Sequence, residues 1–119
     1  LDGFVSASRG EGWGLMQHEA MATGRPVISV NFGGITEFFD DQVGFPVDFR
    51  MAKADGHYEG GGLWAEPDFD SLVGQLQVVY DGGTTVDEKA IRAATRGAQF
   101  SWERSNTDLE NALTLIGLI

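Results

Sequence analysis

The segment from Phe4 to Val30 constrains the fold most, because strand-forming and helix-forming sequence alternate within it. Phe4–Ser8 is a β-forming run, and a glycine-rich loop separates it from a helix-forming stretch over Leu15–Thr23. Pro26 marks the end of this helix, and Val27–Val30 is the nearly continuous apolar run typical of a strand buried on both faces. Strands joined by a helix predict a parallel sheet with helices on its faces.

The remainder of the chain continues this α/β pattern. It predicts one helical turn over 35–39, a third strand over 43–49 and a long glycine-bearing loop over 50–67. Three further helices are expected over about 68–80, 85–98 and 101–117, with Asp68 and Ser101 as N-terminal caps and Thr85 opening a capping box. We expect the helices over 68–80 and 101–117 to be packing elements.

Composition limits the classes of function. The 119 residues suffice for one domain, and no apolar run reaches the roughly 18 residues of a membrane span, so no transmembrane segment is expected. The 18 acidic and 8 basic residues give a net charge of -10, which argues against a nucleic-acid-binding surface. The absence of cysteine excludes disulfides and cysteine metal sites and fits a reducing compartment, so we expect a cytoplasmic location.

Candidate functional residues concentrate between Ser8 and Val27. The helix that begins near Gly14 and Leu15 offers first-turn amides without an internal partner, and with the helix dipole they form an anion site that needs no Lys or Arg. Glu11 lies in the preceding loop and Glu19 is one turn along the helix. We expect both carboxylates to face one pocket at the carboxyl end of the first strand, where they would accept hydrogen bonds from vicinal hydroxyls of a ribose or hexose.

The order of these residues resembles the glutamate-pair motif of retaining GT-B glycosyltransferases, particularly the family 4, or group 1, enzymes. The residues that carry the resemblance are Glu11, Glu19-Ala20-Met21-Ala22, Gly24, Pro26-Val27, Gly33-Gly34 and Glu37. Trp64–Asp68 and Phe100–Glu103 also resemble that family's C-terminal domain, so the similarity covers nearly the whole chain.

The resemblance implies a Rossmann-like, three-layer α/β/α fold with a small parallel sheet, as part of a GT-B C-terminal domain. Residues 1–119 are then expected to be a partial nucleotide-sugar-binding domain, without the N-terminal acceptor domain and the first strands of the donor domain. An exposed apolar strand edge is therefore expected at Phe4–Ala7.

The resemblance also implies a role for each matching residue. Glu11 is the expected catalytic residue, which contacts hydroxyls of the transferred sugar or lies near the reaction centre, and Glu19 is expected to hold the nucleotide ribose. The other expected donor-binding residues are Gly12, Gly14, Leu15, Gly33 and Gly34. Members transfer a sugar from a nucleotide-diphosphate sugar to a carbohydrate, lipid or other acceptor with retention of configuration, without a metal ion or another cofactor. A peripheral association of the full-length enzyme with a membrane is left open.

Several alternatives remain open from the sequence. The chain can be a non-catalytic nucleotide-sugar-binding module, an inactive fragment, or part of another GT-B activity such as a sugar epimerase or phosphorylase. The glycines can be turn residues alone. We interpret His18 as a polar surface or packing residue, Asp40-Asp41 as a solvated turn rather than a metal site, and His57 and Glu59 as parts of a surface loop.

Overall fold

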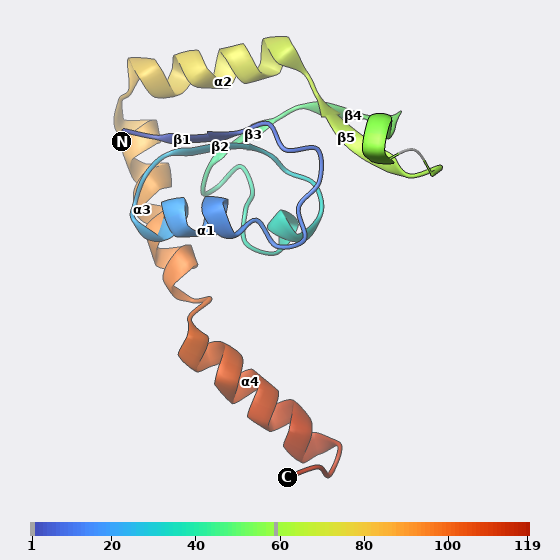
Figure 1. Ribbon diagram of the computed structural model, residues 1–119. Coiled ribbons are helices and arrows are strands. Elements are labelled where there is room, and N and C mark those ends of the chain that lie inside the picture. Colours follow the sequence, from blue (N-terminus) through green and yellow to red (C-terminus); the bar gives the residue numbers. More distant parts are fainter. Residues whose placement is uncertain (1, 59) are drawn as a thin grey trace.

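A computed structural model describes residues 2–58 and 60–119 of the chain (Figure 1). The elements are, in order, β1 (Phe4–Ser6), α1 (Leu15–Ala22), β2 (Val27–Val30), the 3-10 turn η1 (Gly34–Glu37), β3 (Phe45–Val47), β4 (Phe49–Lys53), the 3-10 turn η2 (Gly56–Tyr58), β5 (Leu63–Pro67), α2 (Phe69–Asp81), α3 (Thr84–Ala98) and α4 (Trp102–Leu115).

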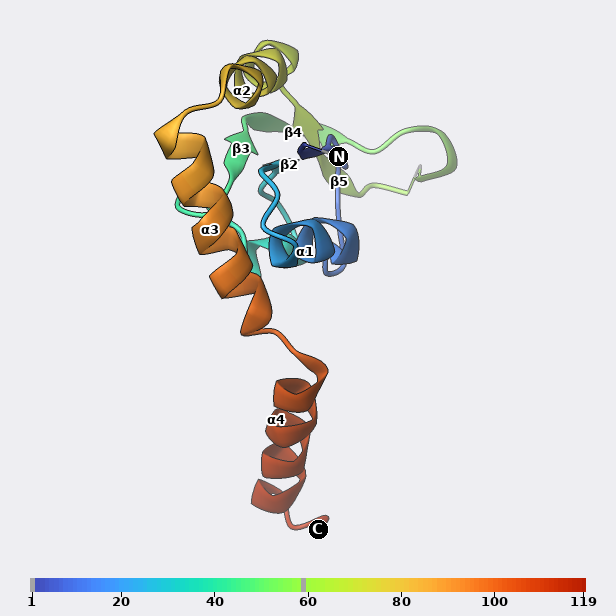
Figure 2. The same ribbon diagram turned by 90° about the vertical axis from the view of Figure 1, so that its left-hand side faces the viewer.

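The centre of the molecule is a parallel sheet of three strands in the order β1-β2-β3. Helix α2 lies over one face of this sheet and α1 over the other, while α3 runs past the β3 side and packs against α1 (Figures 1 and 2). The prediction of an α/β fold with a small parallel sheet between helical layers is therefore confirmed.

Alternate side chains of β2 supply the two halves of the core. Val27 is buried with Met21 of α1 and with Phe38, whereas Ile28 is buried on the opposite face, where Leu72 of α2 packs. All four residues of β2 are buried, as expected for a central strand covered on both faces.

Strand β1 is an edge of this sheet. Among the described strands it pairs only with β2, through Phe4 to Ser6, and its Val5 side chain is 48% exposed. The exposed apolar strand edge expected over Phe4–Ala7 is thus present over β1, which leaves backbone groups of this strand without a sheet partner.

The loop predicted over 50–67 is wrong, because this segment forms most of an antiparallel hairpin. The predicted third strand divides after β3, and β4 pairs with β5 from Phe49 opposite Pro67 to Lys53 opposite Leu63. The hairpin depends on pairing between segments that are separated by a glycine-bearing turn, and neither segment shows a clear apolar period alone.

Two of the three predicted helix caps are confirmed. The Asp68 carboxylate accepts a hydrogen bond from the Ser71 backbone N–H at 2.7 Å, and the Ser101 hydroxyl accepts one from the Arg104 backbone N–H at 3.2 Å. The capping box at Thr85 is wrong, because α3 begins one residue earlier and its N-cap is Gly83, which has no side chain to donate or accept.

Helix α4 does not pack as predicted. It extends away from the rest of the molecule (Figures 1 and 2), and no residue of α4 is buried in the described part of the chain. Leu109, on its expected apolar side, is 57% exposed. No helix within residues 2–58 and 60–119 combines the length and the apolar character needed to cross a membrane.

We predict that Ile35→Ala lowers the free energy of unfolding by about 2–5 kcal/mol, because Ile35 is fully buried in the same core cluster as Met21 and Val27 and the change leaves a cavity. The matched control is Ile91→Ala, since Ile91 is 67% exposed and should change this free energy by less than about 0.5 kcal/mol. Urea denaturation followed by circular dichroism measures both, and equal effects of the two changes would contradict the described core.

The free energy of unfolding should also fall at acidic pH, because the Asp40 carboxylate becomes protonated. Partial burial acts to raise the pKa of this carboxyl, but hydrogen bonds from Arg96 at 2.7 Å and from the Gln42 backbone N–H at 2.9 Å lower it below its ordinary value of 3.8. The carboxylate thus stabilises the native state above pH 3.8, and this contribution is lost as the pH falls through the lower native pKa.

Asp40→Asn should remove that pH-dependent contribution. We expect the stability difference between the wild type and this variant to be largest near pH 7 and to shrink as the pH approaches about 3. Urea denaturation at a series of pH values measures the difference, and a difference that stays constant over this range would refute the assignment.

Candidate functional site

Two loops at the carboxyl ends of β1 and β2 lie directly against each other. Glu11, in the first loop, forms an isolated parallel β-bridge with Gly33, in the second. The Gly34 backbone N–H donates a hydrogen bond to the Glu11 carbonyl oxygen at 3.0 Å. Backbone pairing between the β1 and β2 segments therefore resumes beyond the ends of the two strands. This pairing fixes the backbone of Glu11, the expected catalytic residue.

This approach explains why the second loop contains two glycines. A Cβ on Gly33 would lie 2.7 Å from the Glu11 carbonyl oxygen, and its φ of 82° is in the left-handed region. A Cβ on Gly34 would overlap the carbonyl oxygen of Gly12. Contact between two backbones thus requires these glycines, and their expected contact with a donor stays a prediction.

The N-terminus of α1 follows the Glu11 loop. Its N-cap is Gly14, which adopts a φ of 88° and makes no side-chain hydrogen bond, and the helix begins at Leu15. Leu15 and Met16 are exposed, whereas Gly14 and Gln17 are buried, so one side of the first turn of the helix lies at the surface. Gly12 has open space where a side chain would project. The predicted contact of the Gly14 and Leu15 amides with a diphosphate fits this position and stays a prediction.

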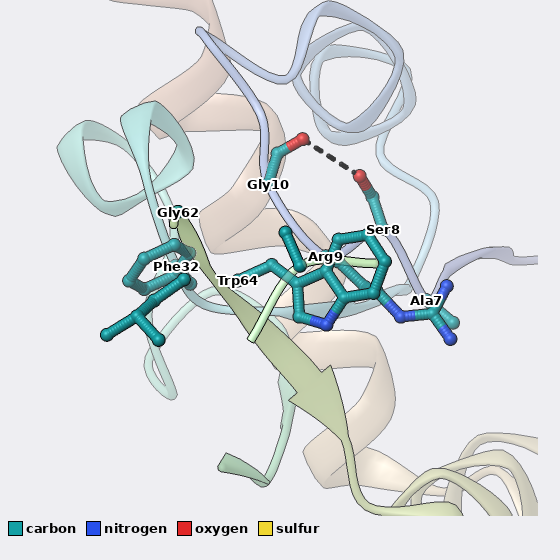
Figure 3. Close-up of a pocket in the computed structure, with 9 residues that line it drawn as sticks. Ala7, Ser8, Arg9, Gly10, Phe32, Gly62 and Trp64 are labelled. Atoms are coloured by element: carbon teal, nitrogen blue, oxygen red, sulfur yellow. Dashed lines mark hydrogen bonds between the residues drawn. The ribbon is translucent and has the colours of Figure 1, made fainter. Parts of the chain in front are cut away.

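A cleft of about 630 Å³ lies beside the first loop, between it and the hairpin (Figure 3). It is lined by Ala7, Ser8, Arg9, Gly10, Phe32, Ala54, Gly62, Leu63 and Trp64. The Ser8 hydroxyl donates a hydrogen bond to the Gly10 carbonyl oxygen at 3.1 Å, which tightens the loop on one side of the cleft. The cleft adjoins the carboxyl ends of β1 and β2, where α/β sheets bind ligands.

Arg9 joins the first loop to the hairpin. Its Nε and Nη2 atoms donate to the two carboxylate oxygens of Glu66 at 2.6 and 3.0 Å, and its guanidinium lies 4.8 Å from the centre of the Trp64 ring. The Arg9 hydrogen bonds lower the pKa of the Glu66 carboxyl, and the same pair raises the pKa of Arg9.

The sequence does not predict this cluster. In β5 the buried Ala65 lies between the partly exposed Trp64 and Glu66, so these two side chains share one face of the strand. Trp64 and Ala65 are both apolar, however, so the residue types do not show the alternation that would indicate a half-buried strand.

Glu11 and Glu19 do not line the same one of these two cavities. Leu15 and Glu19 share a face of α1, as expected, and this face lines a second cavity of about 590 Å³ beside the α3–α4 connection. Glu11 lines neither this cavity nor the cleft beside the hairpin. The expectation that both carboxylates face one donor pocket stays a prediction, as does the role of each carboxylate.

An aromatic cluster closes one side of the second cavity. The Trp13 ring lies 5.0 Å from that of Phe38 and 5.6 Å from that of Phe100, and the His18 ring lies 5.2 Å from that of Phe38. His18 Nε2 is also 3.0 Å from the Gly97 carbonyl oxygen. The interpretation of His18 as a packing residue is therefore confirmed, and the cluster anchors the start of α1 to the end of α3.

The remaining candidates contribute little to this site. Asp40 lies in a turn, and its carboxylate pairs with Arg96 of α3. Glu37 and His57 are exposed, and Glu59 lies outside the described residues. Within residues 2–58 and 60–119, no three His, Asp or Glu side chains are grouped so that they could hold a metal ion.

The sequence is similar to those of known glycosyltransferases. Residues 1–55 match the family described as group 1 glycosyl transferases. The chain is 31% identical over 105 residues to a D-inositol 3-phosphate glycosyltransferase of Paenarthrobacter aurescens, covering 87% of this chain and 22% of that protein. It is 32% identical over 104 residues to the protein of the same name in Jonesia denitrificans, covering 86% and 20%. The chain thus spans about a fifth of the length of the curated relatives it matches.

We predict that Gly34→Ala destabilises the protein by about 1–3 kcal/mol, because the added Cβ would overlap the Gly12 carbonyl and force the two loops apart. The matched control is Gly74→Ala in α2, where a Cβ meets open space and should increase stability by up to about 1 kcal/mol through its higher helix propensity. Urea denaturation measures both changes. A Gly34→Ala variant as stable as the wild type would show that the loops are not held together in this way.

Proposed function

We propose that this chain is part of a group 1 glycosyltransferase and forms the nucleotide-sugar-binding region of its GT-B fold. The observation that carries the proposal is the placement of the Glu11 loop. It lies at the carboxyl ends of two parallel strands, is held against Gly33-Gly34, and leads directly into the N-terminus of α1. The match of residues 1–55 to the group 1 family supports this interpretation.

The proposed reaction moves a sugar from a nucleotide diphosphate to an acceptor hydroxyl with retention of anomeric configuration. The bond between the anomeric carbon and the diphosphate oxygen breaks, a bond from this carbon to the acceptor oxygen forms, and the hydroxyl proton is released. Negative charge grows on the departing diphosphate, and the backbone amides at Gly14 and Leu15 would stabilise it without a metal ion.

Glu11 and Glu19 have separate surroundings, and this separation suits a nucleotide-diphosphate sugar as the donor. Glu11 lies in the loop before α1, and Glu19 lies on the face of α1 that lines the second cavity. A single ligand that contacts both must be extended and must pass the start of the helix. A nucleotide-diphosphate sugar meets this requirement, with its ribose at Glu19, its diphosphate at the helix N-terminus and its sugar toward Glu11.

We predict that Glu11→Gln and Glu19→Gln each lower the transfer rate of the full-length protein by about 10- to 100-fold, because each change removes a charged hydrogen-bond acceptor from the donor. Glu110→Gln on the exposed surface of α4 is the matched control and should leave the rate unchanged. Transfer from UDP-sugars and GDP-sugars to a panel of acceptors is measured by chromatography, with the anomeric configuration of the product read by NMR.

The outcomes separate this proposal from its alternatives. Wild-type rates in both glutamine variants would contradict it. Calorimetric binding of a nucleotide sugar without any transfer would indicate a binding module, and no binding would indicate an inactive fragment. A dependence on inorganic phosphate would indicate a phosphorylase, while conversion of the sugar in the absence of an acceptor would indicate an epimerase.

A further inference from the structure

Two sets of contacts hold the loop that carries Glu11. In the first, the Gly34 backbone N–H donates a hydrogen bond to the Glu11 carbonyl oxygen. In the second, Arg9, two residues earlier in the same loop, contacts the β4–β5 hairpin. The proposed function uses the first of these contacts and gives no role to the second.

Both the main chain and the side chain of Arg9 are fixed by β5. The Arg9 carbonyl oxygen accepts a hydrogen bond from the Ala65 backbone N–H at 3.0 Å. Its guanidinium forms the two hydrogen bonds to Glu66. The guanidinium also lies over the Trp64 ring, and Figure 3 shows the Arg9 and Trp64 side chains next to each other. The three contacts come from consecutive residues of one strand, so a displacement of β5 would displace the Arg9 backbone with it.

The geometry of the Arg9–Glu66 ion pair suits it to orienting the Arg9 side chain more than to stabilising the folded protein. The Arg9 and Glu66 side chains are 47% and 28% exposed, and pairs exposed to this extent add little to the free energy of unfolding. The two parallel hydrogen bonds nevertheless fix the plane and direction of the guanidinium, and the aromatic ring restricts it further. Lysine cannot reproduce this paired geometry, because its ammonium is a single point charge.

We propose that Arg9 and Glu66 are positioning residues for Glu11. Through them the hairpin holds the Glu11 loop two residues before Glu11, so that the Glu11 carboxylate keeps its place relative to the start of α1. This proposal rests on the proposed function of Glu11. It assigns the hairpin a role in the reaction although, among the described strands, β4 and β5 pair only with each other.

The test compares Arg9→Lys and Glu66→Gln in the full-length protein, with Arg92→Lys as the control. Arg92 forms an exposed ion pair with Glu88 on α3, and no contact given for its side chain involves the Glu11 loop, so its change should leave turnover unaltered. We expect the two site variants to lower kcat by about tenfold or more, because a small misplacement of a catalytic group has a large effect on rate. Binding of the nucleotide diphosphate without its sugar should stay within about twofold of the wild type, since Glu11 does not contact that part of the donor.

A double-mutant comparison and a charge exchange separate positioning from a merely structural effect. If Arg9 acts through Glu11, Arg9→Lys should lower kcat in the wild type but not in the Glu11→Gln background. The exchange of Arg9→Glu with Glu66→Arg should restore part of the rate lost in either single reversal. Circular dichroism and thermal unfolding identify any variant that is misfolded, and Glu66→Gln, which keeps the shape of its side chain, then carries the test.

Each outcome decides one of the two proposals. If Glu11→Gln is impaired while Arg9→Lys and Glu66→Gln retain wild-type kcat, the positioning role is overturned and the proposed function stands. Additive losses in the Arg9→Lys, Glu11→Gln double variant also overturn it. If Glu11→Gln itself retains the wild-type rate, the positioning role fails, and the proposed function fails as well if Glu19→Gln also retains that rate.

Discussion

The close approach of the loops after β1 and β2 is the constraint on which the candidate site depends. The carboxyl ends of parallel strands lie at the same edge of a sheet. The side chains in the loops that follow the strands have fixed directions only if other contacts hold the backbones of these loops in place. Here the Glu11–Gly33 bridge extends backbone pairing past the sheet, and glycine at 33 and 34 is what permits the two chains to meet. The position of Glu11 and the start of α1 both follow from this contact.

The three-stranded sheet serves as the foundation for these loops rather than as the site itself. β2 is buried on both faces, so its end is a rigid point from which Gly33 and Gly34 extend. α1 is tied to α3 through an aromatic cluster, which fixes the other end of the Glu11 loop. The hairpin adds a third support through Arg9, at the side where the cleft opens.

Local signals in the sequence were sufficient for much of this fold. The β1-α1-β2 order, the caps at Asp68 and Ser101 and the buried character of Val27–Val30 all arise from neighbouring residues, and all were predicted. The β4–β5 hairpin was not predicted, because neither of its strands shows a clear apolar period alone. The pair of Arg9 with Glu66 was not predicted either, because these residues are 57 positions apart. Helical periodicity placed Leu15 and Glu19 on one face correctly, but it could not show that this face meets the α3–α4 connection.

Helix α4 differs from the rest of the fold in the interactions that stabilise it. Its 14 residues are held by internal hydrogen bonds and by the Ser101 cap, and none of them is buried in the described chain. A helix of this length is only marginally stable in water when nothing packs against it. The backbone amides of α4 therefore open to solvent independently of the core, and they should exchange hydrogen for deuterium far sooner than those of β2. In thermodynamic terms α4 then opens as a unit of its own, at a free energy below that of global unfolding.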